Sequence, residues 1–135
     1  MSDPRSMTTT SVVFACPRCG SAITGPLMRW DGELCFEDGK DTVPRGYFGL
    51  SADFLPGALG RIVVHLDDLV RTAPHPDPRR RNGCRGMDGL DGPNVVCLSG
   101  HEVGTERSDC WTSHGVLLVP NVASHSERRR AEARD

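Results

Sequence analysis

Residues 11–20 read SVVFACPRCG, and this stretch decides how the rest of the chain is interpreted. Its first half, SVVFA, is apolar and partly β-branched, which predicts a short strand. Proline cannot donate to a sheet ladder, so the strand is expected to end at Cys16-Pro17. The strand therefore leads directly into two cysteines, Cys16 and Cys19, that are separated by two residues.

Two thiolates at this spacing can hold one tetrahedral ion when the turn between them directs N–H groups at sulfur. Pro17 presets φ for such a turn, and Gly20 allows the chain to leave it with a positive φ. A thioredoxin-like redox pair is the competing interpretation, and it requires the pair to open a helix in a βαβ unit. Residues 21–25 read SAITG and Pro26 follows, which is not helical. Metal binding is therefore favoured over a redox pair or plain structural thiols.

The C-P-x-C-G string after a strand resembles the first half of a zinc-ribbon site, and the resemblance covers residues 11–20. In zinc ribbons this hairpin faces a second C-x-x-C hairpin, and four sulfur atoms bind one Zn²⁺ between them. The resemblance implies a small antiparallel sheet that is joined by the ion.

The sequence identifies the third and fourth ligands less directly, because a second complete C-x-x-C pattern is absent. Residues 94–98 (NVVCL) predict a strand followed by a short polar turn, which makes Cys97 a candidate. Cys84 lies between two glycines, where the backbone can approach an ion closely. His101 follows Cys97 at a workable C-x₃-H spacing. The first predicted ligand set is Cys16, Cys19, Cys84 and Cys97, with His101 as the alternative to Cys84.

The other two cysteines are predicted not to bind the ion. Cys35 is interpreted as a strand residue that faces away from its neighbours. Cys110 repeats the C-x₃-H spacing with His114 but is interpreted as a packed thiol beside Trp111 in the core. The predicted ion is zinc rather than copper or iron, because tetrahedral sulfur-rich sites favour it. An ion with four protein ligands is structural and contributes on the order of 10 kcal/mol to folding.

Several further short apolar runs predict strands, and turn signals such as Asp-Gly pairs separate them. The expected strands cover residues 33–37, 47–50, 61–66, 94–98 and 114–119. Residues 66–71 predict one or two helical turns, and no segment predicts a long amphipathic helix. The three prolines of residues 72–81 predict an extended connector, or alternatively a recognition loop. The expected fold is mostly β, with small antiparallel sheets, long Gly/Pro-rich loops and a zinc-ribbon-like metal site.

One domain over residues 11–120 is expected in a chain of 135 residues. Residues 1–10 are predicted to be a flexible polar tail. Residues 121–135 are predicted to be a flexible basic tail, in which the C-terminal SERRRAEARD could form a frayed helix. With 37% hydrophobic residues, 15 glycines and 10 prolines, the apolar core should be thin.

Composition and charge disfavour several classes of function. The net charge is −2 and residues 11–120 carry an acidic excess, which argues against a strongly basic nucleic-acid binder. No apolar run is long enough for a membrane span, and no secretory signal is visible, so a cytoplasmic location is expected. The bias towards arginine, with Lys40 the single lysine, hints at a GC-rich bacterial genome. Common hydrolase and phosphate-loop motifs are missing, which makes an enzyme less favoured.

The favoured hypothesis is a structural-zinc β protein that acts as a protein-interaction module. A nucleic-acid-binding zinc ribbon is an alternative, supported by the arginine runs at 79–81 and 128–130. A zinc enzyme with an open coordination position is another, with His101 or His114 as a ligand and Asp88 or Asp91 as a base. A thiol-based sensor in which Cys84 and Cys110 react is the last.

Overall fold

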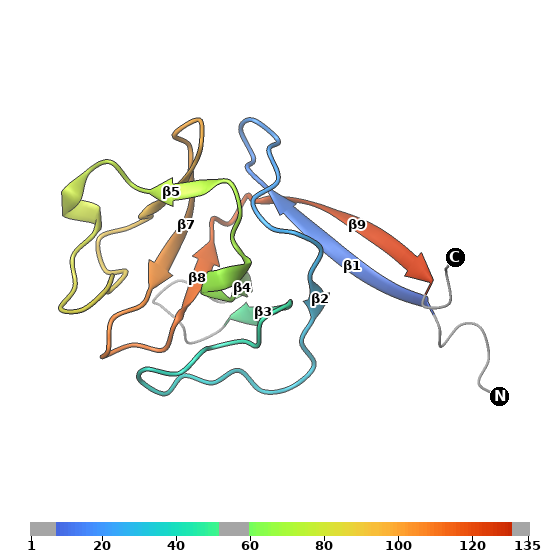
Figure 1. The fold of residues 1–135 in the computed structure, drawn as a ribbon, viewed down its shortest axis with the longest axis horizontal. Coiled ribbons are helices and arrows are strands. Elements are labelled where there is room, and N and C mark those ends of the chain that lie inside the picture. The colour runs from blue at the N-terminus through green and yellow to red at the C-terminus, as the bar shows by residue number, and fades with distance from the viewer. Residues whose placement is uncertain (1–7, 52–59, 131–135) are drawn as a thin grey trace.

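The computed structural model describes residues 8–51 and 60–130, and these form two β-sheets (Figure 1). The larger sheet has the strand order β2-β3-β4-β8-β7-β6-β5, and the smaller consists of β1 and β9. All strand pairs are antiparallel except β2 with β3. The strands are β1 (Thr8–Ala15), β2 (Met28–Arg29), β3 (Tyr47–Ser51), β4 (Arg61–Val64), β5 (Thr72–Pro74), β6 (Val95–Cys97), β7 (Glu102–Arg107), β8 (Gly115–Leu118) and β9 (Ala123–Arg130). The predicted mostly-β fold is confirmed.

The centre of the larger sheet is its most apolar part. All four residues of β8 (GVLL) are buried, and the last two residues of the adjacent β4 are buried as well. Side chains alternate across a sheet, so these strands present apolar groups to both faces. Val63 and Leu117 point to one face, where Leu34 packs on them, while Leu118 belongs to the main core on the other.

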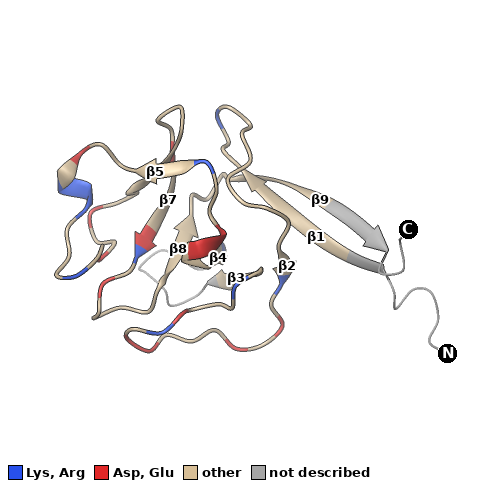
Figure 2. Ribbon diagram, viewed as in Figure 1, with Lys and Arg blue, Asp and Glu red and all other residues tan. Residues whose placement is uncertain are grey.

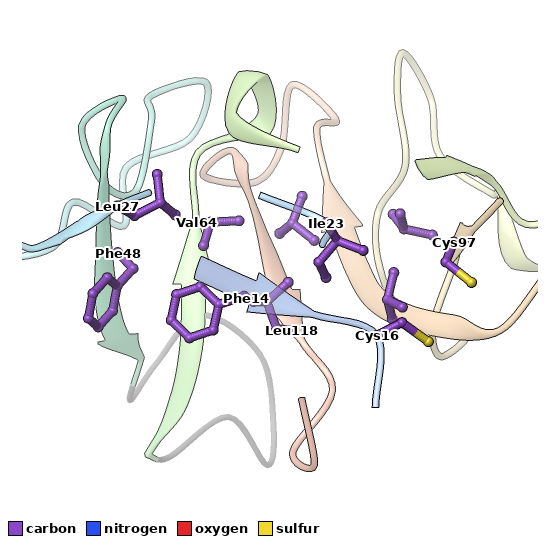
Figure 3. Packing of buried hydrophobic residues seen from close by; sticks show 11 residues of the cluster. Phe14, Cys16, Ile23, Leu27, Phe48, Val64, Cys97 and Leu118 are labelled. Atoms are coloured by element: carbon purple, nitrogen blue, oxygen red, sulfur yellow. The ribbon is translucent and has the colours of Figure 1, made fainter. Parts of the chain in front are cut away.

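The main core lies between the larger sheet and the segment that runs from β1 to β2 (Figure 3). Phe14 on β1 packs edge to face on Phe48 of β3, with ring centroids 5.1 Å apart. Isolated bridges pair Val12 with Leu27 and Ala15 with Ala22, so the chain doubles back against β1. This hairpin covers one face of the sheet and carries Cys16 to the edge of the core.

Most of the predicted strands are present, with ends shifted by a few residues. The expected strands at 11–15, 47–50, 61–66, 94–98 and 114–119 correspond to β1, β3, β4, β6 and β8. The helical turn expected within residues 66–71 is the 3-10 helix η2 (Leu66–Asp68).

The strand predicted over residues 33–37 is wrong, because these residues form no ladder. A backbone bond ties them to the neighbouring loop, from the Cys35 N–H to the Thr42 carbonyl at 3.0 Å. Leu34 packs on the outer face of β4 and β8, while Phe36 is exposed. The alternating pattern therefore reflects an irregular segment that covers the sheet and is not itself part of it.

The predicted connector over residues 72–81 contains regular structure at both ends. Residues 72–74 form β5, the edge strand of the sheet, and Pro78–Arg80 form the 3-10 helix η3. An edge position suits Pro74, since a proline there removes no donor that the sheet needs. No strand was predicted over residues 102–107, which form β7 between β6 and β8, because the segment EVGTER contains a single large apolar residue.

The predicted domain boundaries at residues 10 and 120 do not match the strand ends. β9 occupies Ala123–Arg130, where a flexible tail was expected, and pairs with β1 from Ala15↔Ala123 to Thr8↔Arg130. Backbone hydrogen bonds make this ladder, so it forms without the apolar side chains whose absence suggested a tail. The two strands make a ribbon that extends away from the larger sheet (Figure 1). Residues 1–7 and 131–135 of the predicted tails lie outside the described residues.

Of the residues that the structure describes, none belongs to a helix with the length and hydropathy needed to cross a membrane.

Candidate metal centre

The first part of the candidate site is the turn that follows β1. The Cys16 N–H donates to the Ser21 carbonyl and the Gly20 N–H donates to the Cys16 carbonyl, both at 2.9 Å. Gly20 has a φ of 77°, a conformation that glycine adopts at little cost. These bonds close a tight turn in which Cys16 and Cys19 face the same side, as the C-P-x-C-G pattern predicts.

The second part is the turn between β6 and β7. The Cys97 N–H donates to the His101 carbonyl at 2.9 Å, and the Gly100 N–H donates to the Cys97 carbonyl at 2.8 Å. Gly100 has a φ of 89° and serves here as Gly20 does in the first turn. Cys97 therefore ends one strand and His101 precedes the next.

Four donor atoms from these two turns converge. The ligand atoms of Cys16, Cys19, Cys97 and His101 all lie within 4.8 Å of one another. The Cys19 and Cys97 sulfur atoms are 3.8 Å apart. The His101 Nδ1 atom lies 3.6 Å from the Cys16 sulfur and 3.5 Å from the Cys97 sulfur.

These distances fit a tetrahedron around one small ion. With Zn–S and Zn–N bonds of ordinary length, a tetrahedral site has S···S edges of about 3.8 Å and S···N edges of about 3.6 Å. Three of the six donor–donor distances agree with those edges, and the other pairs lie within 4.8 Å. The two turns therefore hold the donors close to the arrangement that a metal ion requires.

Backbone N–H groups point at the sulfur atoms, which supports the charged form of a thiol. The Arg18 N–H donates to the Cys16 sulfur at 3.4 Å. Burial raises the pKa of the Cys97 thiol, but backbone hydrogen bonds from His101 and Ser99 outweigh it and bring this pKa to about 6. A Ser21 backbone bond acts likewise on Cys19, yet desolvation and the neighbouring thiols raise the pKa of Cys19 overall. Three thiolates this close repel one another, and a cation between them relieves that repulsion.

The site is partly inside the core. Cys16 and Cys97 are buried and belong to the main apolar cluster, whereas Cys19 is exposed and His101 is half-buried. Figure 3 shows the Cys16 and Cys97 side chains at the same end of that cluster. One side of a bound ion would therefore be shielded by the core, and the other would face outward.

The structure brings together three of the four residues in the first predicted set, namely Cys16, Cys19 and Cys97. The fourth position is taken by His101, the predicted alternative, and Cys84 does not join the group. Cys84 lies in the loop beyond η3, where its backbone N–H donates to Asp109 at 3.2 Å. Gly86 allows that loop to pack closely on Ser108, whereas the close approach at Gly83 is to the Gly86 carbonyl within the loop itself.

The remaining predicted residues lie elsewhere. Cys35, Cys110 and His114 are outside the group, and the His114 Nε2 atom contacts the Asp109 carbonyl at 3.1 Å. The expectation of Cys110 and Trp111 in the core is wrong, since Cys110 is exposed and Trp111 is 73% exposed. Both lie in the loop between β7 and β8, where no strand turns the indole inward.

The aspartates suggested as catalytic bases make local turn contacts. Asp88 accepts a hydrogen bond from the Leu90 N–H at 3.0 Å, and Asp91 accepts one from Asn82 at 3.0 Å. Neither belongs to the Cys₃His group. The chemistry that this group offers is the binding of a metal ion by four protein donors.

Comparisons of the chain with protein-family models, curated proteins and solved structures give no match.

Proposed function

We propose that Cys16, Cys19, Cys97 and His101 bind one structural Zn²⁺. We further propose that the protein is a protein-interaction module and that this ion fixes the conformation of its binding surface. The observation that carries the proposal is the convergence of four donor atoms within 4.8 Å. A site of three thiolates and one imidazole favours zinc over magnesium, calcium or manganese, which prefer oxygen ligands. The resemblance of residues 11–20 to a zinc ribbon agrees with this choice.

A structural role is favoured over a catalytic one by the number of ligands. Catalytic zinc sites keep one position for water or substrate, whereas structural sites are filled by four protein donors. Here four protein donors lie within 4.8 Å of one another, and three of their mutual distances agree with the edges of a tetrahedron. A zinc enzyme with an open position would need one of them to leave the ion.

The two metal-binding turns hold exposed side chains in fixed positions. Leu98 lies between the ligands Cys97 and His101 and is 71% exposed, and Arg18 lies exposed between Cys16 and Cys19. An ion that fixes both turns removes most of their conformational freedom in advance, so binding of a partner costs less conformational entropy. The proposed partner is a protein with an apolar pocket for Leu98 and an acidic group for Arg18.

Nucleic-acid binding has weaker support. Positive and negative residues are interspersed around the described part of the larger sheet (Figure 2). Phosphate recognition needs a continuous positive field, and single-strand recognition needs aromatic platforms. Aromatic residues make up 5% of the chain.

The zinc is tested by elemental analysis of the full chain after gel filtration, with an expected content of one zinc per chain. A value near zero after purification without chelators, or loading with a different metal, would refute the metal assignment.

The interaction role is tested by placing a photo-crosslinking amino acid at position 98 in cells. The matched control carries the same group at Glu37, which is also exposed. We expect one protein to be captured from position 98 and not from position 37. Combining the position-98 probe with Cys97→Ser should abolish the capture, and equal capture in all three would contradict the proposal.

A further inference from the structure

A second pair of cysteines lies at the other end of β7 from the metal centre. His101 immediately precedes β7, and the loop that contains Cys110 follows it. The six residues of β7 separate the two sites by about 20 Å. Cys84 and Cys110 are both exposed, and neither belongs to the Cys₃His group.

The backbone around the two cysteines is held by one carboxylate. Asp109 is 4% exposed. Its Oδ2 atom accepts from the Cys84 N–H at 3.2 Å, and its Oδ1 atom accepts from the Cys110 N–H at 2.7 Å. Oδ1 also accepts from the Arg85 N–H at 3.0 Å. One side chain thus binds the main chain of both cysteines.

Backbone packing fixes the same two segments against each other. The Met87 carbonyl accepts from the N–H groups of Ser108 and Asp109, at 2.8 and 3.2 Å. The Met87 N–H donates to the Ser108 hydroxyl at 3.1 Å. At Gly86 the two segments are so close that an added Cβ atom would lie 2.4 Å from the Ser108 carbonyl oxygen. The loop that carries Cys84 therefore rests on the segment that carries Cys110.

We propose that Cys84 and Cys110 are a redox-active thiol pair that hydroperoxides oxidise to an intramolecular disulfide. The hydrogen bonds to Asp109 and the Gly86–Ser108 contact hold the backbones of the two cysteines close together. Both cysteines are exposed, so an oxidant can reach them. The proposal does not depend on the zinc site, because the two sites share no residue.

The environment of Cys110 sets the order of the two oxidation steps. Partial desolvation of its sulfur and the charge of Asp109 raise the pKa of the Cys110 thiol, and the nearby Cys84 adds to the same effect. Backbone N–H groups, that of Arg85 first, lower the pKa of the Asp109 carboxyl, which therefore stays ionised at neutral pH. Thiolates, not thiols, attack peroxides, so the raised pKa makes Cys110 a slow nucleophile, and we expect it to react second, with the oxidised Cys84.

The chemistry balances with one hydroperoxide per pair. The Cys84 thiolate attacks a peroxide oxygen, the O–O bond breaks, and with hydrogen peroxide the released hydroxide takes up a proton to form water. Cys84 is then a sulfenic acid. The Cys110 sulfur attacks the Cys84 sulfur, so an S–S bond forms, the S–O bond breaks, and the hydroxyl leaves as water with the Cys110 proton. The two thiols lose two electrons, which reduce the peroxide to two waters.

The test treats the zinc-loaded full chain with hydrogen peroxide, blocks free thiols with an alkylating agent and digests the protein with trypsin. Cleavage after Arg81, Arg85, Arg107 and Arg128 leaves Cys84 and Cys110 on separate peptides. We expect these two peptides to be joined by a disulfide while the zinc content is unchanged. The proposal is overturned if both cysteines are recovered alkylated, or if the disulfide joins two chains.

Three single variants separate the roles. In Cys110→Ser we expect the sulfenic acid of Cys84 to persist and to react with dimedone. In Cys84→Ser we expect Cys110 to show little dimedone labelling, and equal labelling would overturn the proposed order. The control Cys35→Ser removes a cysteine outside both sites and should form the Cys84–Cys110 disulfide at the wild-type rate.

Discussion

The sharpest test of the metal centre compares two exposed cysteines, Cys19 and Cys84, each replaced by serine. Both thiols lie at the surface, so neither substitution leaves a cavity in the core. Cys19 contributes a sulfur atom to the Cys₃His group and Cys84 does not. Any large difference between the two variants therefore reports on the bound ion.

The size of the expected loss of stability follows from the length of the loop that the ion closes. Zinc would join Cys19 to Cys97, which are 78 residues apart in the sequence. A cross-link over such a loop reduces the entropy of the unfolded chain by an amount worth about 4–5 kcal/mol. Domains of this size have a free energy of unfolding of about 5–15 kcal/mol, so losing the cross-link removes a large fraction of the stability. At about 4 °C per kcal/mol, this entropic part of the ion's contribution should by itself lower the melting temperature by about 15–20 °C.

The assay has two readouts, the zinc content per chain and the thermal unfolding followed by circular dichroism. Cys19→Ser should lose its zinc and unfold at the temperature of the chelator-treated wild type. Cys84→Ser should keep one zinc and unfold close to the untreated wild type. If Cys19→Ser keeps its zinc and its melting temperature, Cys19 is not a ligand. If Cys84→Ser loses them, the assignment of the fourth ligand to His101 is refuted.

The remaining predictions concern the same centre and the packing around it. His101→Ala should weaken zinc binding while His125→Ala, a change at an exposed histidine on β9, should not, as competition with a chelating dye will show. Zinc affinity should fall with decreasing pH, because the thiols must be deprotonated to bind; the fall should steepen below the pKa of the Cys97 thiol, about 6, and an affinity that does not change from pH 8 to 5 would contradict thiolate ligation. Asn94 is fully buried; its side-chain NH₂ donates to the Glu106 carbonyl at 3.0 Å, and its side-chain oxygen accepts from the Glu106 N–H at 2.6 Å. Asn94→Leu should therefore lower the free energy of unfolding by about 2–4 kcal/mol in urea titrations. The control Asn121→Ala, at an exposed position, should lower it by less than about 0.5 kcal/mol. Gly104→Ala places a Cβ atom 2.8 Å from Val116 and should cost about 1–3 kcal/mol, whereas a neutral result would show that β7 and β8 can separate locally.

The parts of the fold that could be predicted are those with a local signal. Apolar β-branched runs mark β4, β6 and β8, because these strands are buried and their residues must be apolar. The polar strands β7 and β9 carry no such signal, since backbone pairing with a neighbour places them in a sheet. Residues 33–37 show the converse, where an alternating pattern arises in a segment that covers a sheet without joining it.

The ligands of the candidate site also differ in whether a local signal could predict them. Cys16 and Cys19 could be predicted because the turn that joins them is encoded within five residues. Cys97 could be predicted from its place at the end of a strand, before a short polar turn. The choice between Cys84 and His101 depended on which distant segment packs against the first turn, and no local pattern carries that information. The C-x₃-H spacing from Cys97 to His101 was the available signal, and Gly100 with its positive φ allows both residues to face one point.

A metal ion bound at this centre would also help a chain with 37% hydrophobic residues to maintain its core. Cys16 and Cys97 are members of the main apolar cluster, so the ion would bind at the end of that cluster and not on a separate lobe. Cys16 follows directly on β1, the strand that makes the ribbon with β9, and Cys97 ends β6 in the larger sheet. A bound ion would therefore join the two sheets at the point where β1 reaches the core. Apolar contacts of a small core and four metal bonds would then stabilise the same junction, and loss of the ion should loosen the ribbon before it unfolds the centre of the larger sheet.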